Sequence, residues 1–152
     1  MELYSIIDTM IKNRFPELSD IEIQLNLEES DDEFTAYGKL DGGGYYINVD
    51  KTLQQAPVPV IQGALAHELV HISLDKGMNF IVRFFDGLLY QLCSWYETYD
   101  ERKTDLLVIK RGYGEQLLAF SKFANEEYEE YTAEDGLTAE EIEKILRDNA
   151  NH

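Results

Sequence analysis

One short segment, His67-Glu68-Leu69-Val70-His71, limits what this chain can fold into more than any other feature. In a helix, residues four positions apart lie on one face, so both imidazoles can reach a single metal ion. Glu68 lies about 100° further around the same helix, where its carboxylate can exchange a proton with a water on the ion without binding the ion itself. This arrangement is typical of hydrolytic zinc sites. The segment therefore predicts a helix that carries two zinc ligands, His67 and His71, and a general base, Glu68.

The residues around this segment favour a buried helix. From Val58 to Leu74 the chain is largely apolar, and Glu68 is its only charged residue. Pro57 and Pro59 stand at the start of this stretch, where proline is tolerated. The alternative is a core helix whose histidines are satisfied by other groups. However, two histidines and a glutamate buried together without a common partner would be costly, which favours a metal ion.

The rest of the chain predicts an α+β fold. We expect a small domain in which a short antiparallel or mixed sheet packs on the helix of His67 and His71, followed by further C-terminal helices. Helical periodicity covers 3–15, and alternation of apolar and polar residues marks strands at 21–27, 34–40 and 45–49. The predicted turns and helix ends lie at 30–33, 41–44 and 75–77, and the predicted later helices cover 79–93, 94–111, 115–130 and 139–147.

Charge excludes some classes of partner. The net charge is −17, and two acidic blocks without a basic residue lie between Arg14 and Lys39 and from Glu126 to Glu143. Nucleic acids and anionic membranes bind cationic surfaces, so neither is expected as a partner. No run approaches the ~20 apolar residues of a membrane span. The N-terminus lacks the features of a signal peptide, and the single cysteine, Cys93, fits a reducing compartment. We expect a cytoplasmic protein.

The length of 152 residues suits one domain with an appendage. We assign 1–125 to the catalytic domain and 126–152 to an acidic C-terminal segment. In this segment Thr138 and Glu141 have the spacing of a capping box, and Leu137 and Ile142 that of a hydrophobic staple, after a hinge at Asp135-Gly136. The segment could fold over the active-site cleft and keep the enzyme latent by autoinhibition. The alternative is a solvated or interacting tail.

A catalytic zinc site needs a third protein ligand. A histidine six residues after His71 would give a three-histidine site, but Gly77 occupies that position. Glu101 is the favoured candidate, because Asp105 follows it four residues later on the same helical face. Asp105 could accept the free ring N–H of a ligating histidine and so fix its tautomer. Glu97 lies on the same stripe and stays open as the alternative ligand.

His67-Glu68-Leu69-Val70-His71 followed by Glu101-x-x-x-Asp105 resembles the gluzincin metallopeptidases, above all their minimal single-domain members, the minigluzincins. The resemblance covers roughly 45–114 and implies a small zincin-like domain. It implies that His67, His71 and Glu101 bind zinc, that Glu68 is the general base and acid, and that Asp105 supports a ligand. It also implies that the strand 45–49 is an edge strand that binds an extended peptide by β-augmentation. The chain departs from the family in the 29 residues between His71 and Glu101 and in Ser73, at a position that is usually apolar.

We therefore expect a zinc-dependent metalloendopeptidase that acts on a peptide or protein substrate. Glu68 takes a proton from the attacking water and passes it to the leaving amine. Tyr113, or else Tyr99, is a candidate donor to the oxyanion of the transition state. One alternative is a catalytically inactive zincin-fold protein that recognises a protein partner. Another is an accessory protease that acts on a single regulator.

Overall fold

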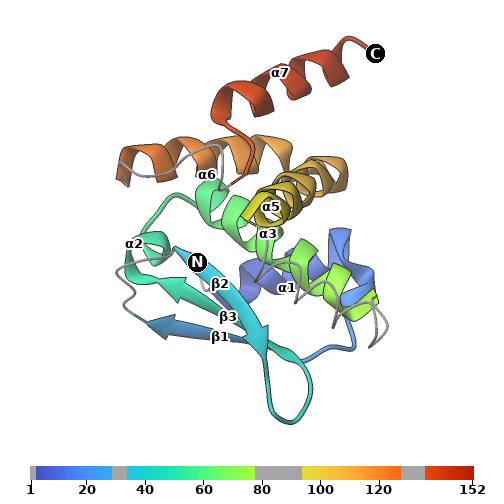
Figure 1. Ribbon diagram of the computed structural model, residues 1–152. Helices are drawn as coiled ribbons and strands as arrows, with labels where there is room; N and C mark the ends of the chain where they lie inside the picture. Colours follow the sequence, from blue (N-terminus) through green and yellow to red (C-terminus); the bar gives the residue numbers. More distant parts are fainter. Residues whose placement is uncertain (1–2, 29–33, 78–93, 128–135) are drawn as a thin grey trace.

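A small sheet lies on one side of a long central helix, and further helices lie on its other side (Figure 1). The computed structural model describes residues 3–28, 34–77, 94–127 and 136–152. Its elements are α1 (Leu3–Arg14), η1 (Pro16–Leu18), β1 (Ile23–Glu28), β2 (Thr35–Lys39), β3 (Tyr45–Asp50), α2 (Lys51–Gln54), α3 (Val58–Gly77), α5 (Ser94–Val108), η2 (Ile109–Tyr113), α6 (Gly114–Glu127) and α7 (Ala139–Ala150). The α+β class is confirmed. The predicted turn at 30–33, the predicted helix at 79–93 and the hinge residue Asp135 lie outside the described residues.

The sheet is mixed and has the strand order β1-β3-β2. β3 pairs in parallel with β1 and antiparallel with β2. The predicted connection at 41–44 leads from β2 into β3. The expectation that the strand 45–49 lies at an edge is therefore wrong. Alternate side chains of β3 (Tyr45, Ile47 and Val49) are buried in the core, and its backbone is hydrogen-bonded on both sides. Among the described strands, β1 and β2 form the edges.

α3 lies in the middle of the molecule because it is apolar nearly all the way around. It contacts α6 most extensively, and it also contacts β2, α5 and α1. The helix runs beyond the predicted end at Leu74, as far as Gly77. Asp75 in this last turn accepts a hydrogen bond from the Tyr45 hydroxyl at 2.6 Å and pairs with Lys39 at 3.1 Å. These contacts attach the end of α3 to the sheet.

α5 and α6 follow each other through the short π-helical segment η2 rather than through a loop. Gly112 interrupts the helical backbone with a φ of 89°, a conformation that glycine adopts at little cost. Arg111 holds η2 against the N-terminal elements. Its guanidinium lies 4.7 Å from the centre of the Phe15 ring and donates hydrogen bonds to the Arg14 carbonyl and the Glu17 carboxylate.

α7 begins with the predicted capping box. The Thr138 side chain accepts a hydrogen bond from the Glu141 N–H, and the Glu141 carboxylate accepts one from the Thr138 N–H. Leu137 and Ile142, the predicted staple pair, are both buried. α7 packs on α6, on the side away from the sheet (Figure 1). It extends to Ala150, three residues beyond the predicted end.

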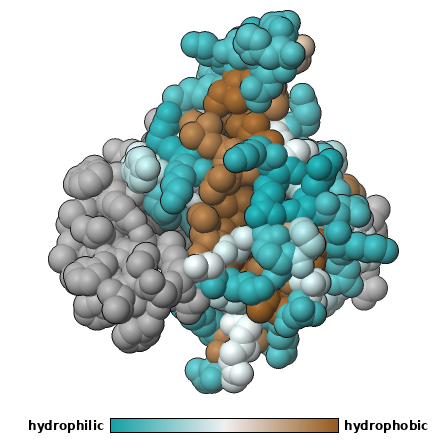
Figure 2. Space-filling view, turned by 90° about the vertical axis from the view of Figure 1, so that its right-hand side faces the viewer, coloured by the Kyte–Doolittle hydropathy of each residue, from teal (hydrophilic) through white to brown (hydrophobic). Residues whose placement is uncertain are grey.

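The surface is mainly hydrophilic on the side shown in Figure 2, where an apolar band runs between hydrophilic residues. Leu106 is 48% exposed and is one of a few large apolar side chains at the surface. In the ranges that the structure describes, no helix is long and apolar enough to cross a membrane.

Candidate metal centre

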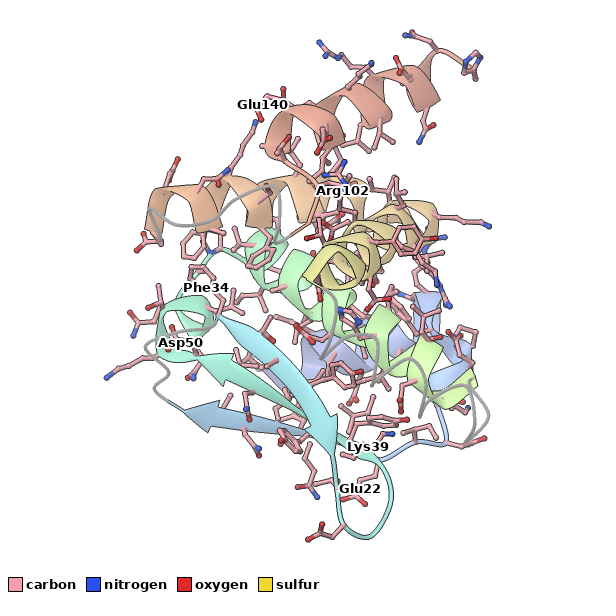
Figure 3. The ribbon with its side chains drawn as sticks, viewed as in Figure 1. Glu22, Phe34, Lys39, Asp50, Arg102 and Glu140 are labelled. Atoms are coloured by element: carbon pink, nitrogen blue, oxygen red, sulfur yellow. The ribbon has the colours of Figure 1, made fainter. Side chains whose placement is uncertain are left out.

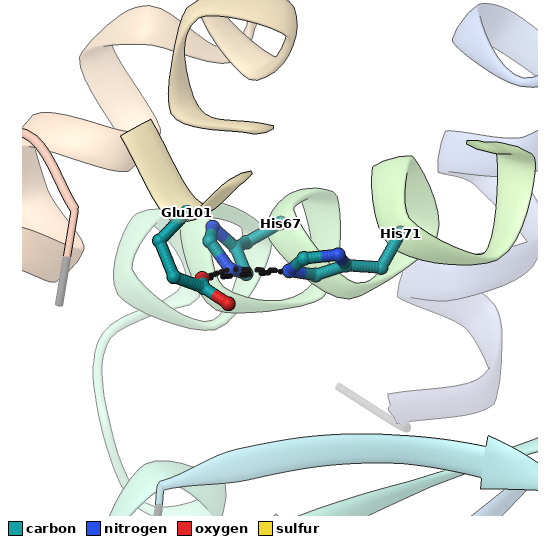
Figure 4. A group of neighbouring side chains, drawn as sticks. All are labelled: His67, His71 and Glu101. Atoms are coloured by element: carbon teal, nitrogen blue, oxygen red, sulfur yellow. Dashed lines mark hydrogen bonds and ion pairs between the residues drawn. The ribbon is translucent and has the colours of Figure 1, made fainter. Parts of the chain in front are cut away.

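The two histidines of α3 point to the same place. His67 and His71 lie one helical turn apart, and their rings meet edge to face with centroids 4.7 Å apart. The Nε2 atoms of the two rings are 3.0 Å from each other (Figure 4). Two imidazole nitrogens this close must share a proton or a common positive partner, because two lone pairs repel each other.

Glu101 comes from α5 and completes the group. Its Oε2 atom lies 2.8 Å from His67 Nε2 and 3.4 Å from His71 Nε2 (Figure 4). The three side chains are largely shielded, with exposed fractions of 13% for His67, 11% for His71 and 18% for Glu101. Burial raises the pKa of Glu101, but its hydrogen bonds and charge interactions with His67 and His71 outweigh burial and hold this pKa far below its ordinary value.

The donor atoms of this triad could hold one metal ion, since they all lie within 4.8 Å of one another. Ligands of a tetrahedral zinc ion with bonds of about 2.0–2.1 Å are about 3.3 Å apart. The three separations in the triad are 2.8, 3.0 and 3.4 Å, close to that value. Two imidazoles and one carboxylate are also a donor set that zinc accepts. The residues therefore fit a metal ion in both spacing and chemistry.

Asp105 lies behind His67, on the side away from the triad. Its Oδ1 atom is 2.8 Å from His67 Nδ1, so the carboxylate can accept the ring N–H and leave Nε2 facing Glu101 and His71. Burial lowers the pKa of the His67 imidazole, but the hydrogen bonds with Asp105 and Glu101 outweigh it and raise the pKa well above 6.5. The two carboxylates thus favour the protonated form of His67, in which each ring nitrogen can donate to one of them.

Glu68 is buried, with 5% of its surface exposed. Burial raises the pKa of Tyr37 above its ordinary value, and the negative charges of Asp75, Glu68 and Asp100 add to this shift. Tyr37 in turn stacks on His71, with ring centroids 5.5 Å apart and an angle of 14° between the planes. Tyr37 thus joins β2 to the triad through His71, and the Glu68 charge lies near enough to Tyr37 to affect its ionisation.

Two neighbours of His71 were not predicted from the sequence. Tyr37 comes from β2, and Asp100 lies on α5 with its Oδ2 atom 3.9 Å from His71 Nδ1. The alternation in β2 puts Tyr37 on one face with Thr35 and Lys39, but it does not tell which face turns toward α3. Asp100 precedes Glu101 directly, so the acidic pair itself was a usable signal.

The structure does not bring the predicted tyrosines into the triad. The Tyr113 ring is buried and stacks on Phe15 with centroids 6.1 Å apart, and among the described contacts none joins it to the metal ligands. Its packing on Phe15, which lies between α1 and η1, follows from η2, which turns this part of the chain toward the N-terminal elements. Tyr99 is 59% exposed on α5. The side chain of Glu97, the alternative ligand, lies outside the described part of the chain.

Comparisons with known proteins add no relationship to this geometry. No protein-family model matches the chain, and neither the curated proteins nor the solved structures contain a significant match to it. The functional interpretation therefore rests on the site itself.

Proposed function

We propose that this protein is a zinc-dependent metallopeptidase of the gluzincin type. The observation that carries this proposal is the convergence of His67, His71 and Glu101 on one point, with the buried Glu68 next to the first ligand. Structural zinc sites use four protein ligands, whereas catalytic ones use three and keep a position for water or substrate. The triad supplies three.

The side chains around the triad have distinct tasks in this proposal. A bound zinc ion would act as a Lewis acid and lower the pKa of water towards ~7. The Glu68 carboxylate accepts the proton of the attacking water and passes it to the leaving amine. The Asp105 Oδ1 atom lies 2.8 Å from His67 Nδ1 and accepts its proton in a hydrogen bond. This bond keeps the Nε2 lone pair available to the metal.

The substrate is a peptide or protein segment that binds along β2. This strand is an edge of the described sheet, it contacts α3, and it carries Tyr37 against His71. An extended peptide can pair with such an edge by β-augmentation. Tyr37 is better placed than Tyr113 to donate to a developing oxyanion, because the Tyr113 ring packs on Phe15 instead.

The test is the Glu68→Gln variant. It keeps the size of the side chain and leaves the three ligands intact, so it should bind zinc as the wild type does. Its cleavage of peptides should fall by about 10²–10⁴-fold, the usual contribution of a general base. Zinc content is measured by elemental analysis, and cleavage is followed on a peptide library with and without a chelator.

Glu126→Gln provides the matched control, since it makes the same chemical change at an exposed position of α6 and should leave cleavage unchanged. Undiminished cleavage by zinc-loaded Glu68→Gln protein would rule out the mechanism. A wild-type protein that binds one zinc ion but cleaves no peptide in the library would instead favour an inactive scaffold that binds a protein partner.

A further inference from the structure

The carboxylate behind His67 is held from two sides. Asp105 is 2% exposed, and while its Oδ1 atom faces His67 Nδ1, its Oδ2 atom accepts a hydrogen bond from the backbone N–H of Leu137 at 2.8 Å. Leu137 stands 32 residues later in the chain and is itself buried. The residue that orients a proposed metal ligand is thus oriented by the segment that leads into α7.

Gly136 makes this contact possible. Its φ of 141° is one that residues with side chains rarely adopt. A Cβ atom at this position would overlap the Oδ2 atom of Asp105. The backbone can therefore bring the Leu137 N–H to the carboxylate only because residue 136 has no side chain.

A second set of bonds fixes the same segment to α5. Arg102 follows Glu101 directly, and its guanidinium donates to the Gly136 carbonyl at 3.2 Å and to both carboxylate oxygens of Glu141 at 3.0 and 2.7 Å. Glu141 also closes the capping box of α7. The Arg102 side chain accordingly joins α5 to the start of α7 (Figure 3).

We infer that residues 136–141, held by Arg102, form a C-terminal clamp that positions His67 for metal binding through Asp105. A two-point hold leaves the buried Asp105 carboxylate a single orientation, which fixes the tautomer and ring angle of His67. Removing the hold frees the carboxylate to turn. Partners of this kind typically change metal affinity by about 10–100-fold. The clamp rests on the metal-binding half of the proposed function and is independent of proteolysis.

Gly136→Ala tests the clamp directly, because the new methyl group displaces Asp105 without touching a metal ligand. Zinc affinity is measured by competition with a chromophoric chelator, and ligand geometry is followed by the absorption spectrum of the Co²⁺-substituted protein. The variant should bind zinc about 10–100-fold more weakly and show an altered Co²⁺ spectrum. Gly42→Ala is the control, since a Cβ atom there meets nothing within 4 Å, and it should match the wild type.

The Asp105→Ala background distinguishes an effect of Gly136→Ala that acts through Asp105 from a general disturbance of the structure. If Gly136 acts through Asp105, Gly136→Ala weakens zinc binding in the wild-type background but has little further effect once Asp105 is removed. Equal weakening in both backgrounds would overturn the clamp. Arg102→Gln leaves the Gly136 backbone intact, and it should also weaken zinc binding, so it serves as the test if Gly136→Ala does not fold.

The outcomes distinguish this inference from the proposed peptidase. Wild-type affinity and an unchanged Co²⁺ spectrum in folded Gly136→Ala protein would reject the clamp and leave the peptidase standing. Clamp variants that bind zinc weakly, beside a wild type that binds zinc but cleaves nothing, would support the clamp and reject the peptidase. A wild type that binds no zinc would reject both.

Discussion

At the scale of single residues, His67 is the point at which a metal ion and a proton compete. Its Nε2 atom faces Glu101 and its Nδ1 atom faces Asp105. Both carboxylates raise the pKa of the imidazole well above 6.5 in the metal-free protein, against the effect of burial. The Nε2 proton must leave before this nitrogen can bind a metal, whereas the Nδ1 proton stays with Asp105.

Zinc affinity should therefore rise with pH. Below the His67 pKa, each bound ion displaces about one proton, so the logarithm of the association constant should increase by about one for each pH unit and level off above that pKa. Competition titrations between about pH 6 and pH 9 measure the slope, and calorimetry in buffers of different ionisation enthalpy counts the protons. An affinity that does not change over this range would contradict the protonated His67.

The contribution of His67 to the stability of the metal-free fold changes with pH in the opposite direction. A group whose pKa is raised by folding stabilises the folded state below its unfolded pKa, about 6.5 for histidine. That contribution is lost as the pH rises through the folded-state pKa. The increase in melting temperature on adding zinc should consequently be larger at high pH than at low pH.

At the scale of elements, the contact between α3 and α6 decides where the metal-binding helix lies. Gly63 faces α6, where an added Cβ atom would lie 2.8 Å from the Phe120 Cβ atom and would overlap the backbone of Gln116. Real Cβ atoms do not approach so closely, so the helices must separate if the glycine is replaced. The approach of α6 to α3 thus depends on one residue without a side chain.

Gly63→Ala should destabilise the protein by about 1–3 kcal/mol, the usual cost of overpacking a core. Alanine is otherwise the better helix former, so propensity alone predicts the opposite sign. Urea unfolding followed by circular dichroism measures the change.

Gly77→Ala is the matched control on the same helix, because a Cβ atom there meets nothing within 4 Å. It should be neutral or stabilise by up to about 1 kcal/mol. Equal effects of the two substitutions would contradict the close approach of α3 and α6.

At the scale of the whole molecule, a net charge of −17 opposes compaction. Added salt screens this repulsion, and it also weakens local ion pairs such as Arg111–Glu17 and Arg102–Glu141. Exposed pairs contribute little, so the repulsion among the surplus acids should dominate.

The melting temperature of the metal-free protein should therefore rise with sodium chloride. A gain of about 1 kcal/mol corresponds to about 2–4 °C for a chain of this size. Potassium chloride at the same ionic strength should act alike, because screening depends on ionic strength. A melting temperature that falls with added salt would show that the local ion pairs outweigh the repulsion.

The sequence by itself determined the local features of this protein. Helical spacing placed His67 and His71 on one face, alternation of apolar residues located the three strands, and the spacing of Thr138 and Glu141 predicted the capping box that the structure contains. Each of these depends on residues within one or two turns of each other, so periodicity is enough to find them.

Only the tertiary structure decided which distant residues surround the triad. It placed β3 in the centre of the sheet and β2 at its edge, set Tyr37 rather than Tyr113 against the site, and brought the Leu137 N–H to Asp105. The physical reason is that these contacts join residues far apart in the chain, 22 positions for the pairs of β1 and β3, 34 for Tyr37 and His71, and 32 for Asp105 and Leu137. Their partners are chosen by how whole elements pack, and an N–H group or a ring face leaves no spacing pattern that could reveal its partner in advance.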